Sequence, residues 1–242
     1  MSNNPKRAAP AFLASVKNAP EACEAFAAGA DVIDCKDPEG GALGRLDLDE
    51  ISRVVQGISA LAPVSATIGD TFQAPADAVI AAQAVAATGV AIVKCGFFGL
   101  DGDAALAQAL GQEDLGRAKL FAVLMADRVA DFSLVPHLAR AGFIGVMLDT
   151  AGKERGSLRK IMDEDRLAAF LDAVRAHKLA AGLAGSLGLD DIAPLVTLGP
   201  DLLGFRGALC AGGRTGELDE ARVVAVRRAL DAAQKSQERS VA

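Results

Sequence analysis

The chain has 242 residues, enough for one large domain or two small ones. Hydrophobic residues make up 51% and charged residues 23%, a balance that supplies an ordinary core and excludes a disordered chain. The formal net charge of −6 and the absence of tryptophan and tyrosine argue against a nucleic-acid-binding surface, because such surfaces need cations and stacking platforms.

The sequence predicts a cytoplasmic protein without a membrane span. No apolar run reaches the roughly 18 residues that a transmembrane helix needs. The apolar residues after the basic N-terminal segment are interrupted at Lys17, too early for a signal peptide. The four cysteines form no C-x-x-C pair, so we expect reduced thiols, buried or half-buried, and no zinc site.

Short apolar segments alternate with helical patterns along the chain, as expected for strands covered on both faces of a parallel sheet. Eight units of about 30 residues predict a single-domain α/β protein with the (β/α)₈ barrel, or TIM barrel, fold. An open doubly wound sheet is the alternative. We expect the barrel at residues 11–237, a flexible extension at 1–10 and a C-terminal tail at 238–242. The predicted strands are Phe12–Val16, Val32–Lys36, Val64–Ile68, Ala91–Cys95, Leu120–Met125, Ile144–Asp149, Leu179–Ala184 and Leu202–Arg206.

The clearest predicted helix is Asp163–His177. Leu167, Phe170, Leu171 and Val174 recur there at the spacing that forms one apolar stripe. Proline and acidic residues that favour the first turn of a helix stand before other alanine-rich segments. These further helix starts are Pro20-Glu21, Pro75, Asp131 and Asp219.

An internal repeat favours the barrel over the open sheet. Gly29, Gly89, Gly142 and Gly199 are 60, 53 and 57 residues apart, about two strand–helix units each. Each stands just before an even-numbered predicted strand, where a glycine can end the preceding helix in the left-handed conformation. A period of one quarter of a barrel is hard to obtain from an open sheet.

Polar residues occupy the ends of the even-numbered predicted strands, where barrel enzymes carry their active sites. Asp34 and Lys36 are two residues apart and project to the same face of their strand. Alignment of the repeats puts Lys94 at the level of Asp34, and Asp149 at the level of Lys36. Two lysines and two carboxylates are therefore predicted to converge at the top of the lumen. A buried structural ion-pair network is the alternative, and Lys94 could instead point outward.

Two neighbouring lysines indicate amine chemistry. A lysine crowded by another ammonium group and by apolar walls is more readily neutral, and a neutral lysine attacks a carbonyl to form a Schiff base. The second lysine and the carboxylates can then move protons, a task that histidine often has elsewhere. His137 and His177 both fall on predicted helices. We predict no metal and no organic cofactor, because no ligand cluster with metal spacing is visible.

Glycine-rich segments after the last two predicted strands indicate phosphate binding. Backbone N–H groups of such loops suit phosphate, and these loops are the usual phosphate site of a barrel. The residues predicted to bind phosphate are Gly185, Ser186, Arg206, Gly207 and Ala208, with Arg214 beside them. A third glycine-rich segment, residues 39–45, follows Lys36 and either covers the site or is a plain connection.

Five segments together resemble the (5-formylfuran-3-yl)methyl phosphate synthase family of methanofuran biosynthesis. The resemblance covers about residues 11–235, and residues 1–10 have no counterpart. Asp37 stands where archaeal members carry asparagine, which changes the charge beside Lys36. The five segments are Gly29 to Pro38, Ser65 to Asp70, Met147 to Lys153, Leu183 to Ser186 and Arg206 to Ala208.

The resemblance implies a barrel lyase that condenses two molecules of glyceraldehyde 3-phosphate, with loss of phosphate and water. It implies that Lys36 is the Schiff-base lysine and Lys94 the proton acceptor. The remaining active-site residues that it implies are Asp34, Asp149 and Lys153.

Two other functions stay open on the sequence. One is a Schiff-base aldolase for another phosphorylated sugar, which would give reversible aldol products only. The other is a non-catalytic barrel that binds a phosphorylated metabolite and regulates a partner, although such a protein has little use for a buried Asp34–Lys36 pair. We expect small triose phosphates as partners, and neither nucleic acid nor membrane. A homo-oligomer formed through helix faces is a further possibility.

Overall fold

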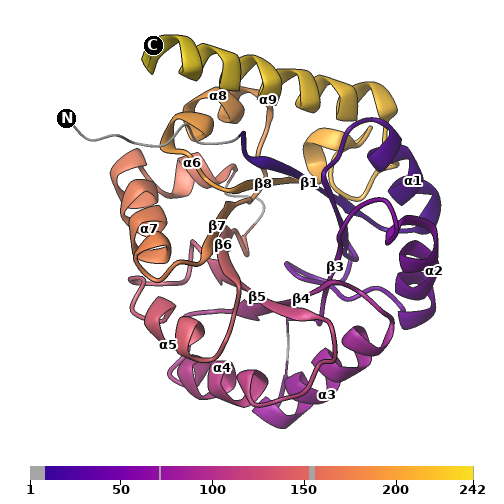
Figure 1. Ribbon diagram of the computed structural model, residues 1–242, viewed down its shortest axis with the longest axis vertical. Coiled ribbons are helices and arrows are strands. Elements are labelled where there is room, and N and C mark those ends of the chain that lie inside the picture. Colours follow the sequence, from indigo (N-terminus) through magenta and orange to yellow (C-terminus); the bar gives the residue numbers. More distant parts are fainter. Residues whose placement is uncertain (1–8, 71, 153–155, 242) are drawn as a thin grey trace.

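The computed structural model describes residues 9–70, 72–152 and 156–241 (Figure 1). Strands and helices alternate along these residues, and every strand pairs in parallel with the next. The last strand, β8, pairs with β1 and closes the barrel in the order β1 to β8. The predicted single-domain (β/α)₈ barrel is confirmed, and the open sheet is excluded.

Every predicted strand is present, and no boundary differs by more than two residues. The strands are Ala11–Val16 (β1), Val32–Cys35 (β2), Val64–Thr67 (β3), Ile92–Phe97 (β4), Lys119–Met125 (β5), Gly145–Asp149 (β6), Ala180–Leu183 (β7) and Leu202–Phe205 (β8).

The helices form a ring around the strands, and α9 closes this ring between α8 and α1 (Figure 1). The last helix includes residues 238–241, which the sequence analysis assigns to a tail. The helices are Ala19–Ala27 (α1), Leu48–Ile58 (α2), Pro75–Ala87 (α3), Asp103–Gly111 (α4), Val135–Arg140 (α5), Leu158–Ile161 (α6), Glu164–Ala176 (α7), Leu189–Leu198 (α8) and Glu220–Val241 (α9), with a 3₁₀ turn at Gly207–Leu209 (η2).

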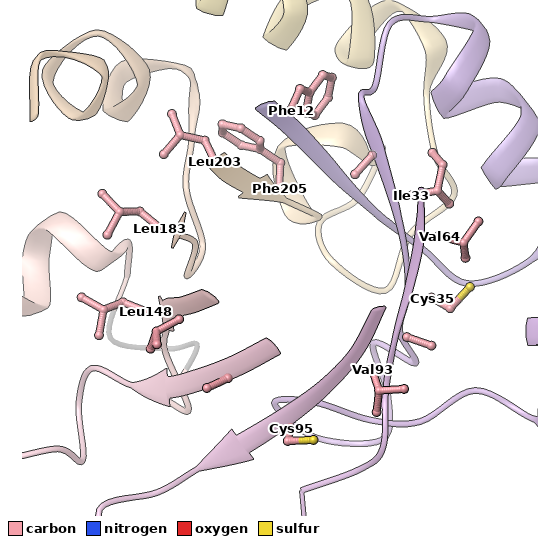
Figure 2. Packing of buried hydrophobic residues seen from close by; sticks show 14 of the residues in the cluster. Phe12, Ile33, Cys35, Val64, Val93, Cys95, Leu148, Leu183, Leu203 and Phe205 are labelled. Carbon is pink, nitrogen blue, oxygen red and sulfur yellow. The ribbon is translucent and has the colours of Figure 1, made fainter. Parts of the chain in front are cut away.

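The main core lies between the strands and the helices. Alternate side chains of each strand point away from the barrel axis into this layer, among them Phe12, Ile33 and Cys35 (Figure 2). On the helix side, the predicted stripe of α7 is fully buried, and Asp163 caps that helix by accepting a hydrogen bond from the backbone N–H of Arg166. The alternation leaves the other half of each strand's side chains for the lumen.

The repeated glycines end helices as predicted. Gly29, Gly89, Gly142 and Gly199 have φ angles of +104°, +89°, +82° and +69°, and they precede β2, β4, β6 and β8. Glycine adopts this left-handed conformation without the strain that a Cβ atom would add. The repeat therefore fixes where each even-numbered strand begins, and so which of its residues reach the top of the barrel.

The predictions for histidine and cysteine are confirmed with one exception. His137 lies in α5 and His177 follows the last residue of α7, and both side chains are exposed. Cys23 is exposed on α1, so the expectation of burial is wrong there, whereas the other three cysteines are buried. Within the described ranges, no helix combines the length and apolar character needed to cross a bilayer.

Candidate active site

Strands β2 and β4 bring Asp34 and Lys94 together inside the barrel. Lys94 Nζ lies 3.0 Å from Asp34 Oδ2. The same carboxylate accepts hydrogen bonds from Ser15 Oγ at 2.9 Å and from Ser65 Oγ at 2.6 Å. Asp34 has no exposed surface, and 5% of the Lys94 side chain is exposed. Lys94 therefore points inward, and three donors from three different strands satisfy the buried carboxylate.

A second ion pair lies nearer the mouth of the barrel. Lys36 directly follows β2, and its Nζ lies 3.1 Å from Asp149 Oδ2 at the end of β6. Both side chains are largely buried, and Asp149 Oδ1 also accepts the backbone N–H of Thr150. The predicted convergence of two lysines and two carboxylates is confirmed. Among the described residues, each of these two ammonium groups faces a carboxylate.

The two pairs border a cavity of about 460 Å³ at the C-terminal ends of the strands. Lys36, Lys94 and Asp149 line it, and Asp34 lies directly beneath Lys94. The opposite wall comes from the loops after β7 and β8 and contains every residue that the sequence predicts to bind phosphate. That wall includes Gly185, Ser186, Arg206, Gly207 and Ala208.

Residues 37–44, which we call the covering loop, close the other side of the lumen. Leu43 is fully buried there and packs with lumen residues such as Phe121 and Met147. Asp70 Oδ2 accepts the N–H of Ala42 at 2.8 Å, and Thr67 Oγ1 donates to Gly44 O at 2.8 Å. The glycine-rich segment after Lys36 thus packs into the lumen through Leu43 and is held by β3 and the residues after it.

Arg214 holds the covering loop from the opposite side. Its Nη2 donates to Pro38 O and, at 2.8 Å, to Gly41 O. Among the described residues no carboxylate pairs with Arg214, although its side chain lines the cavity. Because Lys36 and Lys94 are each neutralised by a partner, Arg214 gives the cavity wall an unbalanced positive charge.

The guanidinium of Arg206, a residue that lines the cavity, is occupied by other groups of the protein. Its guanidinium forms a buried ion pair with Glu21, and its remaining N–H groups donate to the backbone carbonyls of Ser15, Arg214 and Gly216. A guanidinium has five N–H groups, and all five are occupied here. Any anion at this wall must therefore find other donors.

The backbone of the two glycine-rich loops offers such donors. The N–H groups of Ser186, Gly207 and Ala208 have no acceptor among the residues that the structure describes. Gly185 and Ser186 both adopt positive φ angles, +106° and +49°, which bend the loop after β7 at the cavity wall. For Ser186 this conformation is strained, and strain of this kind clusters at functional sites.

Asp127 fixes the turn that follows Asp149. Its two carboxylate oxygens accept the N–H groups of Ala151 and Gly152, each at 2.8 Å. Burial alone would raise the pKa of Asp127, but these two hydrogen bonds, together with one from its own backbone N–H and the nearby charge of Arg128, lower the pKa below its usual value. Lys153, which the sequence analysis places in the site, lies outside the described residues. Within those residues no three His, Cys, Asp or Glu side chains gather as a metal would need.

Several residues of the site escape the sequence analysis. Ser15 lies in a predicted strand and Leu43 in the third glycine-rich segment, but nothing in either segment marks these two residues as part of the site. Ser65 and Asp70 fall within one of the segments that carry the family resemblance, and that position is the signal that could have found them. Glu21 resembles any acidic residue in a first helical turn, so its partner 185 residues away is invisible in the sequence.

The fold and the site together define a class. A closed (β/α)₈ barrel with charged side chains around a cavity at the C-terminal ends of its strands has the architecture of the TIM-barrel enzymes. Solved structures with a similar fold include phosphoribosyl anthranilate isomerase from Thermus thermophilus, with a TM-score of 0.65 and 11% sequence identity. The match covers 92% of this chain and 98% of that one. At this identity the likeness concerns the fold alone.

Sequence comparison then gives the family. The model of the 4-HFC-P synthase family matches residues 12–227, and the chain belongs to that family. A relative from Methylorubrum extorquens is 46% identical over 217 residues, 89% of each chain. Proteins of Methanosarcina acetivorans and Methanothermobacter thermautotrophicus, both named (5-formylfuran-3-yl)methyl phosphate synthase, are 34% and 32% identical. These two matches cover 84% and 91% of this chain and 92% and 98% of the relatives.

Proposed function

We propose that this protein is a lyase that condenses two molecules of glyceraldehyde 3-phosphate into (5-formylfuran-3-yl)methyl phosphate through a Schiff base on Lys36, as a step of methanofuran biosynthesis. Membership of the 4-HFC-P synthase family supports the product. The observation that carries the mechanism is the pair of lysines at one cavity, each with its own carboxylate at about 3 Å.

Lys36 forms the covalent intermediate in this proposal. Its proton passes to Asp149, the carboxylate 3.1 Å away, and the neutral amine attacks the carbonyl carbon of the first triose phosphate after its conversion from the aldehyde to the ketone form. A carbon–nitrogen bond forms, and the carbonyl oxygen leaves as water. The resulting imine draws electrons from the neighbouring carbon and makes its C–H bond acidic.

Lys94 and Asp34 move the protons. Lys94 passes its own ammonium proton to Asp34, 3.0 Å away, and the neutral amine then accepts the proton on the carbon next to the aldehyde. Return of this proton to the former aldehyde carbon, with transfer of the hydroxyl proton to the former carbonyl oxygen, gives the ketone with which Lys36 forms its imine. Loss of a second proton, from the carbon next to the imine, gives an enamine; its carbon attacks the aldehyde of the second triose phosphate, and the new carbon–carbon bond restores the imine.

Elimination and ring closure complete the conversion. Hydrolysis of the imine returns Lys36, and loss of one phosphate with ring closure and dehydration yields the aromatic furan. Atoms balance when two triose phosphates give one phosphorylated furan aldehyde, one inorganic phosphate and two waters. The aromatic ring makes the sequence irreversible, which suits a biosynthetic step and separates it from a simple aldolase.

We assign the substrate phosphate to the wall formed by the loops after β7 and β8. The N–H groups of Gly185, Ser186, Gly207 and Ala208 provide donors there, and the unbalanced charge of Arg214 favours an anion. Arg206 contributes through its backbone and through the loop that it holds, since its guanidinium is occupied.

Borohydride trapping tests the mechanism. The protein is incubated with glyceraldehyde 3-phosphate and borohydride, and peptide mass analysis locates the added mass, which we expect on Lys36. Lys36→Arg keeps the positive charge but cannot form an imine, so turnover should vanish while the fold persists. Lys119→Arg is the matched control, because Lys119 is exposed at the opposite end of the barrel.

The products distinguish the remaining possibilities. Formation of the furan aldehyde phosphate from glyceraldehyde 3-phosphate alone supports the proposal. Reversible aldol products without a furan would show an aldolase instead, and saturable binding without any product would show a binding protein. Label on Lys94 would exchange the two lysine roles, and absence of label on any lysine during turnover would refute the Schiff base.

A further inference from the structure

We propose that the buried Glu21–Arg206 ion pair is a positioning device that sets the phosphate-binding wall, and that the Arg206 side chain itself never contacts the phosphate. The inference deepens the proposed function, since it rests on phosphate binding at the loops after β7 and β8. It names two residues, one of them in α1, that influence substrate affinity from behind the cavity.

The occupied guanidinium is the first argument. Arg206 Nε donates to Arg214 O and Nη2 donates to Gly216 O, both at 2.8 Å. Nη1 donates to Ser15 O at 3.2 Å, and the two terminal nitrogens share the carboxylate of Glu21, at 2.5 and 3.3 Å. A phosphate could bind this side chain only by displacing acceptors that are already buried.

The second argument is the number of segments that Glu21 connects. Besides Arg206, its carboxylate accepts the N–H of Lys17 at 2.9 Å and the N–H of Leu218 at 3.3 Å. Glu21 is only 4% exposed and stands in the first turn of α1, where Asn18 caps the helix. One carboxylate therefore fastens the end of β1 and the returning end of the loop after β8.

The third argument is what this loop presents to the cavity. It leaves β8 at Arg206, forms η2 and returns to an antiparallel bridge between Cys210 and Leu218. Gly207 and Ala208 line the cavity with N–H groups that have no acceptor among the described residues, and the side chain of Arg214 reaches from this loop to the covering loop. Arg206 holds the Arg214 and Gly216 carbonyls in the same loop, so the ion pair sets the position of the donors that the loop after β8 contributes to this wall.

The energetics favour a role beyond stability. Burying two charges costs desolvation, and apolar side chains of similar volume often stabilise a fold equally well or better. Only 11% of the Arg206 side chain and 5% of the Glu21 side chain are exposed. A hydrogen-bonded ion pair does, however, fix the relative orientation of the segments that it joins, and donors that bind phosphate need accurate placement.

Glu21→Gln gives the discriminating experiment, because the two roles of Arg206 predict opposite results. If Arg206 is a phosphate ligand, loss of the Glu21 charge frees its guanidinium, and inorganic phosphate binds equally well or more tightly. If the pair positions the wall, phosphate binding weakens although Arg206 is intact. We expect the calorimetric Kd of inorganic phosphate to rise about tenfold or more, since misplacement by about 1 Å can lower rates on the order of a hundredfold.

Two companions complete the test. Arg206→Lys should weaken phosphate binding similarly and raise KM much more than it lowers kcat. Arg227→Lys is the matched control, because Arg227 forms an ion pair with Asp31 at the opposite end of the barrel, 3.0 Å apart. It should lower Tm without changing the Kd of phosphate. A Glu21→Gln protein with reduced Tm but wild-type phosphate affinity would overturn the proposal and leave the pair a purely structural one.

The wild-type protein provides an answer even where a variant does not fold. In a titration with inorganic phosphate followed by nuclear magnetic resonance, the Gly207 and Ala208 amide signals should shift, and a crystal structure with phosphate should keep all five Arg206 hydrogen bonds. A phosphate oxygen bonded to the Arg206 guanidinium would refute the inference, and so would the absence of phosphate binding. Phosphate binding without furan formation would refute only the proposed function.

Discussion

Replacing Asp34 by asparagine tests what the buried carboxylate does for the fold. The substitution keeps the shape of the side chain and removes its charge. With the amide oxygen at the Oδ2 position, Ser15 and Lys94 keep their acceptor, and the amide NH2 group donates to Ser65 Oγ, whose hydroxyl turns; the main loss is therefore the counterion of Lys94. An ammonium group with 5% of its side chain exposed then stays in the lumen without a carboxylate partner at 3.0 Å.

The expected size of the effect follows from this burial. Removing one partner of a buried ion pair destabilises a protein by about 3–5 kcal/mol. For a domain of this length each kcal/mol lowers Tm by about 2–4 °C, so Asp34→Asn should melt roughly 6–20 °C below the wild type. Chemical denaturation followed by circular dichroism measures the loss of unfolding free energy directly.

A double variant separates charge from packing. In Asp34→Asn combined with Lys94→Met, the uncompensated ammonium is gone, and most of the lost stability should return. The double variant should nevertheless be inactive, because both groups that move protons in the proposed reaction are absent. If it is as unstable as Asp34→Asn alone, the cost lies in the hydrogen bonds or the packing, and the reasoning about the buried charge is wrong.

Three other predictions concern the neighbourhood of the site. The pKa of Asp127 is lower in the folded state than its unfolded value of about 3.9, so the ionised carboxylate stabilises the fold at pH values above about 3.9. Asp127→Asn should therefore be less stable than the wild type at pH 7. This difference in stability should disappear as the pH falls through the folded-state pKa of Asp127. Gly96→Ala should cost about 1–3 kcal/mol and expose the covering loop to proteolysis, since the new Cβ would lie 2.5 Å from Leu43 Cδ1. Gly102→Ala, which meets nothing within 4 Å, is its control. Chelators should leave turnover unchanged; full loss restored by one divalent ion would contradict a lysine-based mechanism.

The four charged residues of the lumen were predictable because the barrel repeats itself. Once the glycine before each even-numbered strand is aligned, strand alternation alone brings Lys94 to Asp34 and Asp149 to Lys36. This reasoning needs only the period of the sequence and the geometry of a strand. It succeeds where the backbone is regular.

The same reasoning does not predict the conformations of the loops. No local sequence pattern indicates that the Arg206 side chain faces Glu21 rather than the cavity. Its direction depends on the path of the loop after β8, which folds back through the bridge between Cys210 and Leu218. The burial of Leu43 in the lumen likewise depends on space beside Gly96 and on hydrogen bonds in which Asp70 accepts and Thr67 donates. Irregular backbone is set by long-range contacts, and these leave no periodic signal.

The alternation of β2 also separates two nucleophiles that are neighbours in the sequence. Cys35 precedes Lys36, but its sulfur lies outside the barrel, between strands and helices (Figure 2). Burial, with the nearby charges of Asp34 and Glu50, raises the pKa of its thiol and suppresses the thiolate. Sulfur adds readily to aldehydes to give hemithioacetals, so a thiolate beside Lys36 would compete for any carbonyl compound bound there. In the proposed reaction, a one-residue step along the strand thus keeps the thiol away from the aldehyde substrate.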